Sequence, residues 1–212
     1  MKKSVAIIGK GPSVRYSTKD FIDSFDEVAI CNFPPMENYQ HLISNRATYH
    51  FLNAGDPFPY EREFLNNLGL RRIFNTSRDI VPPQKSFIPN HQVIYFEDYG
   101  VHVKKRYEDQ YGFWPSTGVM AFDYFLNSPD HDTISLVGFD FFQSGKSVYY
   151  FLKNETNPSL HYLWENNTYS KDGKMLSTSA HGGDKAKNTV MSLIAKSDKE
   201  ITVLQSISYL EP

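Results

Sequence analysis

The sequence of 212 residues has a single cysteine, Cys31, and no long uninterrupted apolar run. One cysteine excludes a disulfide within the chain and cannot by itself make a cysteine zinc site, and it fits a reducing compartment. The apolar run Val5–Ile8 near the basic start ends at Gly9, so it is too short for a signal-peptide core or a membrane span. We therefore expect a cytoplasmic protein.

The sequence also has no excess of charge of one sign. Its 22 Lys and Arg residues nearly balance its 24 Asp and Glu residues, and the formal net charge is −2. No overall field favours nucleic acid, and we expect no nucleic-acid partner. The same balance favours no anionic membrane over the whole surface, while peripheral membrane association and a homo-oligomer are left open. Hydrophobic residues make up 40% of the chain, enough for the core of one domain over residues 1–212.

Short apolar segments alternate with helical patterns along the chain. Seven segments have the length and composition of buried strands: 4–8, 27–31, 47–52, 72–75, 92–96, 133–137 and 201–204. Helices are expected after a capping box at 17–20 and over 36–44, 60–68, 117–126 and 184–195. This alternation predicts an α/β fold, a Rossmann-like domain whose mostly parallel sheet has helices on both faces. Residues 151–180 lack clear periodicity and are expected to form one long, lid-like excursion.

In such sheets, ligands bind beyond the carboxyl ends of the strands, near a switch in strand order. Gly9-Lys10-Gly11 follows the first strand, and its glycines would let the backbone approach a phosphate at the start of a following helix. The segment lacks the third glycine of the dinucleotide fingerprint and does not fit a Walker A loop. A plain tight turn is therefore an equal alternative.

Two later segments also stand where a strand or helix meets this edge. Ser116-Thr117-Gly118 opens a predicted helix, so its hydroxyls could cap that helix or face a bound nucleotide. Gly138-Phe139-Asp140 ends a predicted strand, where an acid can bond ribose hydroxyls or, alternatively, cap a turn.

His181 precedes a helix that Asp184 can cap, and its imidazole suits a general base because it titrates near neutral pH. His161 is the competing candidate, although we expect it to pack with neighbouring aromatic residues. The acidic pair Asp130 and Asp132 comes before a strand, at the wrong end of the sheet for the expected site. We therefore interpret this pair as a turn and expect no metal site.

Taken in order, these segments resemble the CMP-sialic acid-dependent sialyltransferases, especially the compact bacterial type. The matching pieces follow the family's order and cover most of the chain: Ile7–Ser13, Cys31-Asn32, Phe51–Asn53, Ser116–Gly118, Gly138–Phe142, and His181 with Lys187–Thr189.

The resemblance implies a Rossmann-like fold and an inverting, metal-independent transfer of sialic acid, or a related keto acid sugar, to a glycan hydroxyl. The CMP-sugar is the donor substrate, so no cofactor is expected, and the acceptor would be a glycan such as a lipooligosaccharide or capsule precursor. The resemblance implies that His181 takes the proton from the acceptor hydroxyl. It also places seven residues around the CMP portion: Asn32, Asn53, Ser116, Thr117, Gly138, Phe139 and Asp140.

Several positions depart from the family's pattern. Lys10 replaces an asparagine, and Trp114 stands where an arginine is expected. Of the two tyrosines that steady the departing phosphate in the family, the first position is occupied by Phe142, and Tyr149 or Tyr150 could supply the second. Residues 182–186 are inserted after the histidine.

These departures keep two alternatives open. Lys10 and Phe142 favour a CMP- or nucleotide-binding module that has lost catalysis. A Rossmann-like oxidoreductase is a third reading, and the missing third glycine disfavours it.

Overall fold

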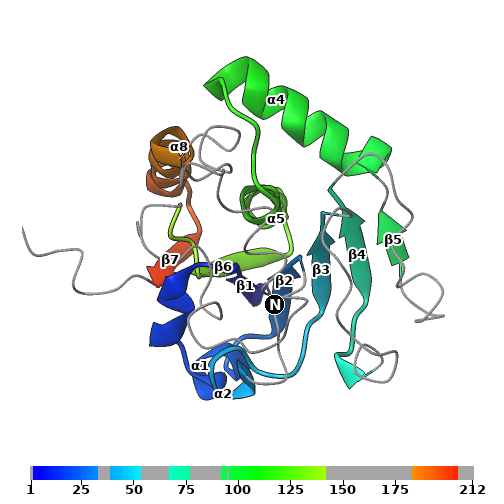
Figure 1. Cartoon of the computed structure of the whole chain (residues 1–212), viewed down its shortest axis with the longest axis vertical. Helices are drawn as coiled ribbons and strands as arrows, with labels where there is room; N and C mark the ends of the chain where they lie inside the picture. The colour runs from blue at the N-terminus through cyan, green and yellow to red at the C-terminus, as the bar shows by residue number, and fades with distance from the viewer. Residues whose placement is uncertain are drawn as a thin grey trace, which may run out of the picture.

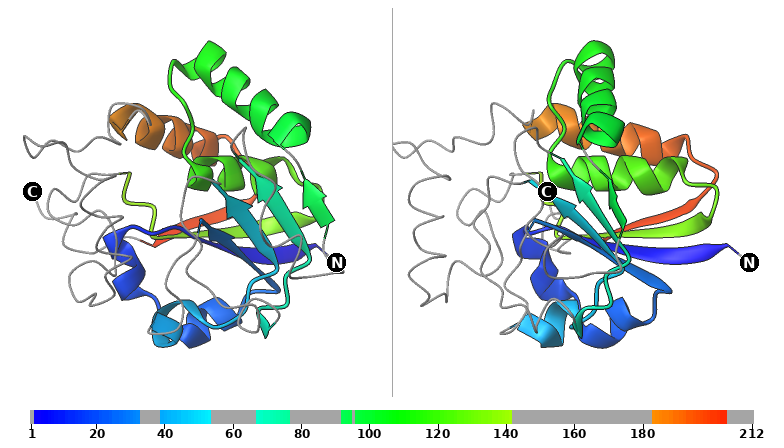
Figure 2. Two further views of the ribbon diagram at one scale, coloured as in Figure 1. Left: turned by 45° about the vertical axis from the view of Figure 1, so that its right-hand side comes forward. Right: turned by 90° about the vertical axis from the view of Figure 1, so that its right-hand side faces the viewer.

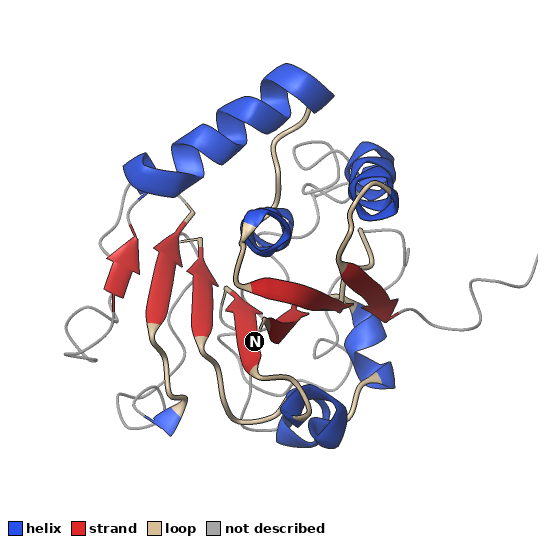
Figure 3. Cartoon of the chain, turned by 180° about the vertical axis from the view of Figure 1, so that it is seen from behind, coloured by secondary structure: helices blue, strands red, loops and turns tan. Residues whose placement is uncertain are grey.

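The computed structural model describes residues 2–32, 39–53, 67–76, 92–94, 96–141 and 183–204. At the centre of this part lies a seven-stranded sheet in the order β5-β4-β3-β2-β1-β6-β7, with all neighbouring strands parallel (Figures 1 and 3). The strands are β1 (Lys3–Ile8), β2 (Glu27–Cys31), β3 (Tyr49–Leu52), β4 (Arg72–Asn75), β5 (Gln92–Ile94), β6 (His131–Val137) and β7 (Glu200–Leu204).

The seven predicted strands and the parallel sheet are confirmed, each strand within two residues of its expected bounds. The chain moves outward from β1 to β5 and then returns to β6, which pairs with the free side of β1. The strand order therefore switches between β1 and β6, whose last residues Ile8 and Val137 are paired. This is the position where ligands bind in open α/β sheets.

Helices cover both faces of the sheet, as expected (Figure 2). One face carries α4 (Val101–Tyr111), α5 (Thr117–Asn127) and α8 (Gly183–Ala195). The other carries the short 3-10 helix η1 (Pro12–Tyr16), α1 (Lys19–Asp23) and α2 (Gln40–Ile43).

Strand β1 shows how the sheet separates two cores. Val5 and Ile7 belong to the larger core under α5, whereas Ala6 and Ile8 belong to the smaller core beside η1 and α1. Alternate side chains of a strand point to opposite faces, and all four are fully buried because both faces are covered. The near-continuous apolar sequence of β1 follows from this arrangement.

Helix α4 was not predicted. Only Val103 and Tyr107 of this helix are fully buried, so its apolar stripe is narrow, and Gly112 ends it with a left-handed φ of 69°. A π-helical turn, η4 (Phe96–Gly100), leads into it. The prediction that the fifth strand reaches Phe96 is therefore wrong, because this residue already begins the helical segment.

The helix boundaries bring further corrections. The first helix is capped by Thr18, whose Oγ1 accepts a hydrogen bond from Phe21 N at 3.2 Å, and not by Ser17. Helix α8 begins at Gly183, so Asp184 lies in its first turn rather than at its cap. The predicted helix 36–44 is seen as the shorter α2, with residues 36–38 outside the described part. Most of the predicted helix 60–68 and all of the predicted excursion 151–180 also lie outside it.

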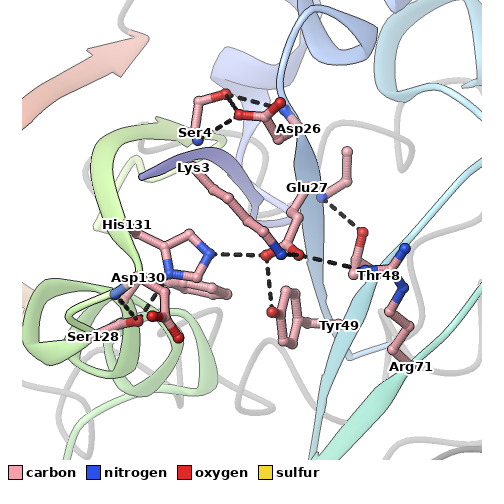
Figure 4. Close-up of polar contacts among 12 residues, drawn as sticks. Lys3, Ser4, Asp26, Glu27, Thr48, Tyr49, Arg71, Ser128, Asp130 and His131 are labelled. Carbon is pink, nitrogen blue, oxygen red and sulfur yellow. Dashed lines mark hydrogen bonds and ion pairs between the residues drawn. The ribbon is translucent and has the colours of Figure 1, made fainter. Parts of the chain in front are cut away.

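A buried carboxylate joins four strands at the amino edge of the sheet (Figure 4). Glu27 is only 3% exposed. Its Oε1 accepts from Lys3 Nζ at 2.6 Å, and its Oε2 accepts from the Tyr49 hydroxyl at 2.8 Å. The same Oε2 lies 2.8 Å from His131 Nε2. These partners come from β1, β3 and β6, so Glu27 fixes the relative positions of the strand starts.

This network explains the Asp-His-Asp segment of the sequence. Asp130 lies in the turn before β6, Asp132 is exposed in the strand, and His131 between them points toward Glu27. The segment is at the amino edge, as expected, away from the switch in strand order. The histidine of this segment is a buried hydrogen-bond partner of Glu27.

The protonation of Glu27 links this network to acid stability. Burial raises the pKa of Glu27, but hydrogen bonds from Lys3, His131 and Tyr49 outweigh that effect and hold the pKa below its usual value. A carboxylate with a lower pKa in the folded state stabilises the fold at neutral pH. That contribution disappears as the pH falls through the folded-state pKa.

We expect Glu27→Gln to lower the free energy of unfolding at neutral pH by about 2 kcal/mol, because charged and polar partners lose a buried carboxylate. Urea denaturation should measure this difference, and the gap from the natural protein should narrow as the pH falls below the usual glutamate pKa. Asp132→Asn, which neutralises an exposed carboxylate nearby, is the matched control and should leave the midpoint unchanged. An equal loss in both variants would contradict the role of Glu27.

Candidate functional site

Polar and glycine residues gather at the carboxyl edge of the sheet, around the switch between β1 and β6. They come from the ends of β1, β2, β3, β4 and β6 and from the start of α5. The residues on this edge are Gly9–Ser13, Asn32, Asn53, Thr76, Ser116–Gly118 and Gly138–Asp140. The eleven binding residues expected from the sequence are therefore all at one edge of the fold.

The turns that follow β1 and β6 are bonded to each other. Gly11 N donates to Gly138 O at 3.0 Å. Asp140 Oδ2 accepts from both the backbone N and the hydroxyl of Ser13, at 2.9 and 2.8 Å. Asp140 thus caps the start of η1, which is the alternative role considered for it. Its other oxygen, Oδ1, makes no hydrogen bond to a described residue.

Burial raises the pKa of Asp140, and the two hydrogen bonds from Ser13 only partly offset this. The carboxylate is thus partly withdrawn from water while it holds the two turns together. Its environment would strengthen any hydrogen bond made by Oδ1.

Close packing between the two turns explains the glycines. A Cβ at Gly9 would lie 2.6 Å from Gly138 O, and a Cβ at Gly11 would lie 2.1 Å from Asp140 Oδ2. Gly138 itself has a left-handed φ of 74°. Contacts within the fold therefore explain the glycines at these positions, without the phosphate that the sequence led us to expect. The first helical segment after these glycines is the five-residue η1, which aligns few backbone amides.

Asn32 and Asn53 lie together at the ends of β2 and β3. Asn32 has a positive φ of 57°, and its N donates to Phe51 O at 2.7 Å. Its side-chain Oδ1 accepts from Asn53 N at 2.8 Å. A backbone N–H requires an oxygen, so this bond fixes the orientation of the Asn32 amide. The Nδ2 end is left as the end that can donate to a ligand.

The charge of Lys10 acts on the end of β2. Burial raises the pKa of Cys31 to about 12, and the positive charge of Lys10 opposes this rise. The Cys31 thiol itself is buried and stays protonated at neutral pH.

Helix α5 starts at this edge. Ser116 is its N-cap, with Oγ accepting from Val119 N at 3.3 Å, as the capping alternative predicted. Thr117 follows in the first turn and is 7% exposed. A Cβ at Gly118 would lie 3.2 Å from the ring of Phe139. The start of α5 is thus packed against the end of β6.

Thr76 belongs to this edge and was missed in the sequence. It follows β4, is 1% exposed, and donates from both N and Oγ1 to Leu52 O, at 2.8 and 2.9 Å. Its Oγ1 also lies 3.3 Å from Thr117 Oγ1. Applying the strand-end rule to the predicted strand 72–75, as to the others, would have found it.

The expected catalytic residues, His181, Tyr149 and Tyr150, lie outside the described residues, as do His161 and Phe142. Helix α8 runs from the carboxyl edge back to the start of β7, because β6 and β7 are parallel. Lys187–Thr189 forms part of its first half.

Over the described ranges, no three His, Cys, Asp or Glu side chains come together where they could hold a metal ion. In the same ranges, no helix has both the length and the apolar composition needed to cross a membrane.

No protein-family model matches the sequence, and no curated protein sequence matches it. Solved structures do match. A mammalian sialyltransferase aligns at 16% identity with a TM-score of 0.61, over 95% of this chain and 68% of its own. The fold is that of the sialyltransferases.

Two further structures of this fold were solved with bound molecules. A mammalian sialyltransferase in complex with Gal-beta-1-3GalNAc-ortho-nitrophenol aligns at 16% identity, with a TM-score of 0.57 over 95% of this chain and 69% of its own. The sialyltransferase CstII from Campylobacter jejuni, in complex with the substrate analogue cytidine-5′-monophosphate, aligns at 17% identity. Its TM-score is 0.55, over 95% of this chain and 79% of its own. The expected sialyltransferase-like fold is thus confirmed.

We expect Gly11→Ala to destabilise the protein by roughly 2 kcal/mol, because the added methyl group overlaps Asp140 Oδ2 and Gly138 O. Thermal unfolding measures the effect. Gly118→Ala is the comparison variant and should destabilise less, since its methyl group would lie 3.2 Å from the Phe139 ring rather than 2.1 Å from an oxygen, and its residue lies in a helix. Equal melting temperatures for Gly11→Ala and the natural protein would contradict the close packing of the two turns.

Proposed function

We propose that this chain is a glycosyltransferase that moves sialic acid, or a related keto acid sugar, from a CMP-sugar to a glycan hydroxyl. The observation that carries the proposal is the convergence of the expected binding residues at the switch between β1 and β6. The shared fold of CMP-bound sialyltransferases supports the choice of CMP among nucleotides.

The described residues can meet a nucleoside monophosphate in two ways. Lys10, the Asn32 Nδ2 group and the Ser116 hydroxyl are donors or cations suited to the phosphate. Donors aimed at developing negative charge stabilise a departing phosphate, so the proposed reaction needs no metal. Asp140 Oδ1 could accept from a ribose hydroxyl, since Ser13 occupies only Oδ2.

For the chemical step we propose His181 as the general base. The sequence places it two residues before α8, which begins at the carboxyl edge. His181 would take the proton of the acceptor hydroxyl while that oxygen attacks the anomeric carbon and the bond to the CMP phosphate breaks. A single displacement of this kind inverts the anomeric centre. Tyr149 and Tyr150 are the proposed partners of the departing phosphate.

Lys10 and Phe142 favour a second candidate, a CMP-binding module without catalysis. Such a module would bind CMP as the glycosyltransferase does but would not turn over a CMP-sugar donor.

Incubation with CMP-sialic acid and a galactose-terminated glycan in the presence of EDTA tests the proposed function. Mass spectrometry should detect the sialylated glycan together with released CMP, and CMP-Kdo serves as the alternative donor. Release of no CMP from either donor, with CMP binding intact, would leave the non-catalytic module as the function.

We expect His181→Ala to lower the transfer rate by roughly a hundredfold, because a general base contributes about that much to such a step. CMP affinity should stay unchanged, since the base acts on the acceptor. His161→Ala is the matched control and should retain the natural rate. Near-normal transfer by His181→Ala, with a loss in His161→Ala, would reassign the base.

A further inference from the structure

Two neighbouring hydroxyl groups at the candidate site differ in what they can offer a ligand. The Ser116 hydroxyl oxygen already accepts a hydrogen bond from Val119 N, so its own proton can be donated to a ligand. The Thr117 hydroxyl contacts a different partner, the hydroxyl of Thr76 at the end of β4.

The proton of the Thr76 hydroxyl can be located from its contacts. Thr76 Oγ1 lies 2.9 Å from Leu52 O. A carbonyl oxygen can only accept, and two oxygens at this distance would repel each other without a proton between them. The single hydroxyl proton of Thr76 is therefore in the bond to Leu52 O.

The direction of the second bond follows. Thr76 has no further proton to give, so the 3.3 Å contact between the two threonine hydroxyls requires Thr117 to be the donor. Two successive hydrogen bonds therefore run in one direction, from the Thr117 hydroxyl to Thr76 Oγ1 and from the Thr76 hydroxyl to Leu52 O. Both threonines are buried, at 7% and 1% exposure, and reversing a hydrogen bond in such surroundings is costly.

We propose that Thr76 is a positioning residue that makes Thr117 a hydrogen-bond acceptor toward the nucleotide. Thr117 would then bind a donor group of the cytidine portion, either a ribose hydroxyl or the cytosine amino group. It cannot serve the phosphate, whose oxygens only accept. The inference deepens the proposed function and rests on it.

Calorimetric titration with CMP and with cytidine tests the role of Thr117. We expect Thr117→Val, which keeps the shape, to weaken both ligands by the same factor of about ten, because a ligand donor loses its acceptor. Ser116→Ala should weaken CMP more than cytidine. A Thr117→Val loss confined to CMP would overturn the proposal while leaving CMP recognition, and the proposed function, in place. Absence of CMP binding by the natural protein would overturn both.

The role of Thr76 is tested by selectivity, which a purely structural residue would not alter. UMP lacks the amino group, and 2′-deoxy-CMP and 3′-deoxy-CMP each lack one hydroxyl. The natural protein should discriminate against one of the three by about tenfold, and Thr117→Val should lose that discrimination. The loss identifies the donor group bound by Thr117 and separates it from a ribose hydroxyl bound by Asp140.

Thr76→Ser keeps the hydroxyl that accepts from Thr117 and donates to Leu52 O, so this selectivity should be retained. Thr76→Val releases the Thr117 proton, so the discrimination should fall severalfold. Selectivity unchanged in Thr76→Val, or no discrimination by the natural protein, would overturn the proposal. Should Thr76→Val fail to fold, Thr76→Ala also removes the hydroxyl oxygen that accepts from Thr117 and should lower the discrimination in the same way.

Discussion

The strands β1 and β6 end side by side, and the backbones of the turns that follow them are in close contact. Gly9 and Gly11 lie against Gly138, and Asp140 holds the β1 turn through Ser13. This packing leaves no room for a side chain at Gly9 or Gly11. The positions of Lys10 and of the Asp140 carboxylate depend on this contact.

Buried polar groups serve different purposes at the two edges of the sheet. At the amino edge, Glu27 is bonded to Lys3, Tyr49 and His131, so its hydrogen-bonding capacity is used within the fold. At the carboxyl edge, the hydrogen bonds that Asn32 and Asp140 make with described residues each use one end of the polar group. Asn32 illustrates this, because its Oδ1 accepts from Asn53 N, whereas its Nδ2 donates no hydrogen bond to a residue that the structure describes. The first edge supplies stability, and recognition of a ligand is the role that we propose for the second.

The strands could be predicted because a parallel sheet covered on both faces requires nearly continuous apolar segments, as in β2. The strand-end rule then pointed to Gly9–Gly11 and Gly138–Asp140 at the candidate site, and the family resemblance placed Asn32 and Asn53 there. Thr76 also follows a predicted strand, so the strand-end rule points to it although the prediction did not include it. Helix α4 could not be predicted from apolar spacing, since Val103 and Tyr107 are its only fully buried side chains.

The role of the glycines could not be read from the sequence. Gly11 faces Asp140, a residue far along the chain, and a local pattern cannot distinguish a turn that approaches a phosphate from one that approaches another turn. The N-cap of α1 is Thr18 and not the predicted Ser17 for a related reason. Both residue types can cap a helix, and the tertiary fold decides between them.

The most direct test is calorimetric titration of the natural protein with CMP, UMP, GDP and NAD, each with and without magnesium. A site formed at the switch between β1 and β6 for a CMP-sugar predicts selective CMP binding that magnesium does not alter. Preference for another nucleotide, or binding of none, would mean that the chain shares the fold of the sialyltransferases without their donor, and would contradict the account.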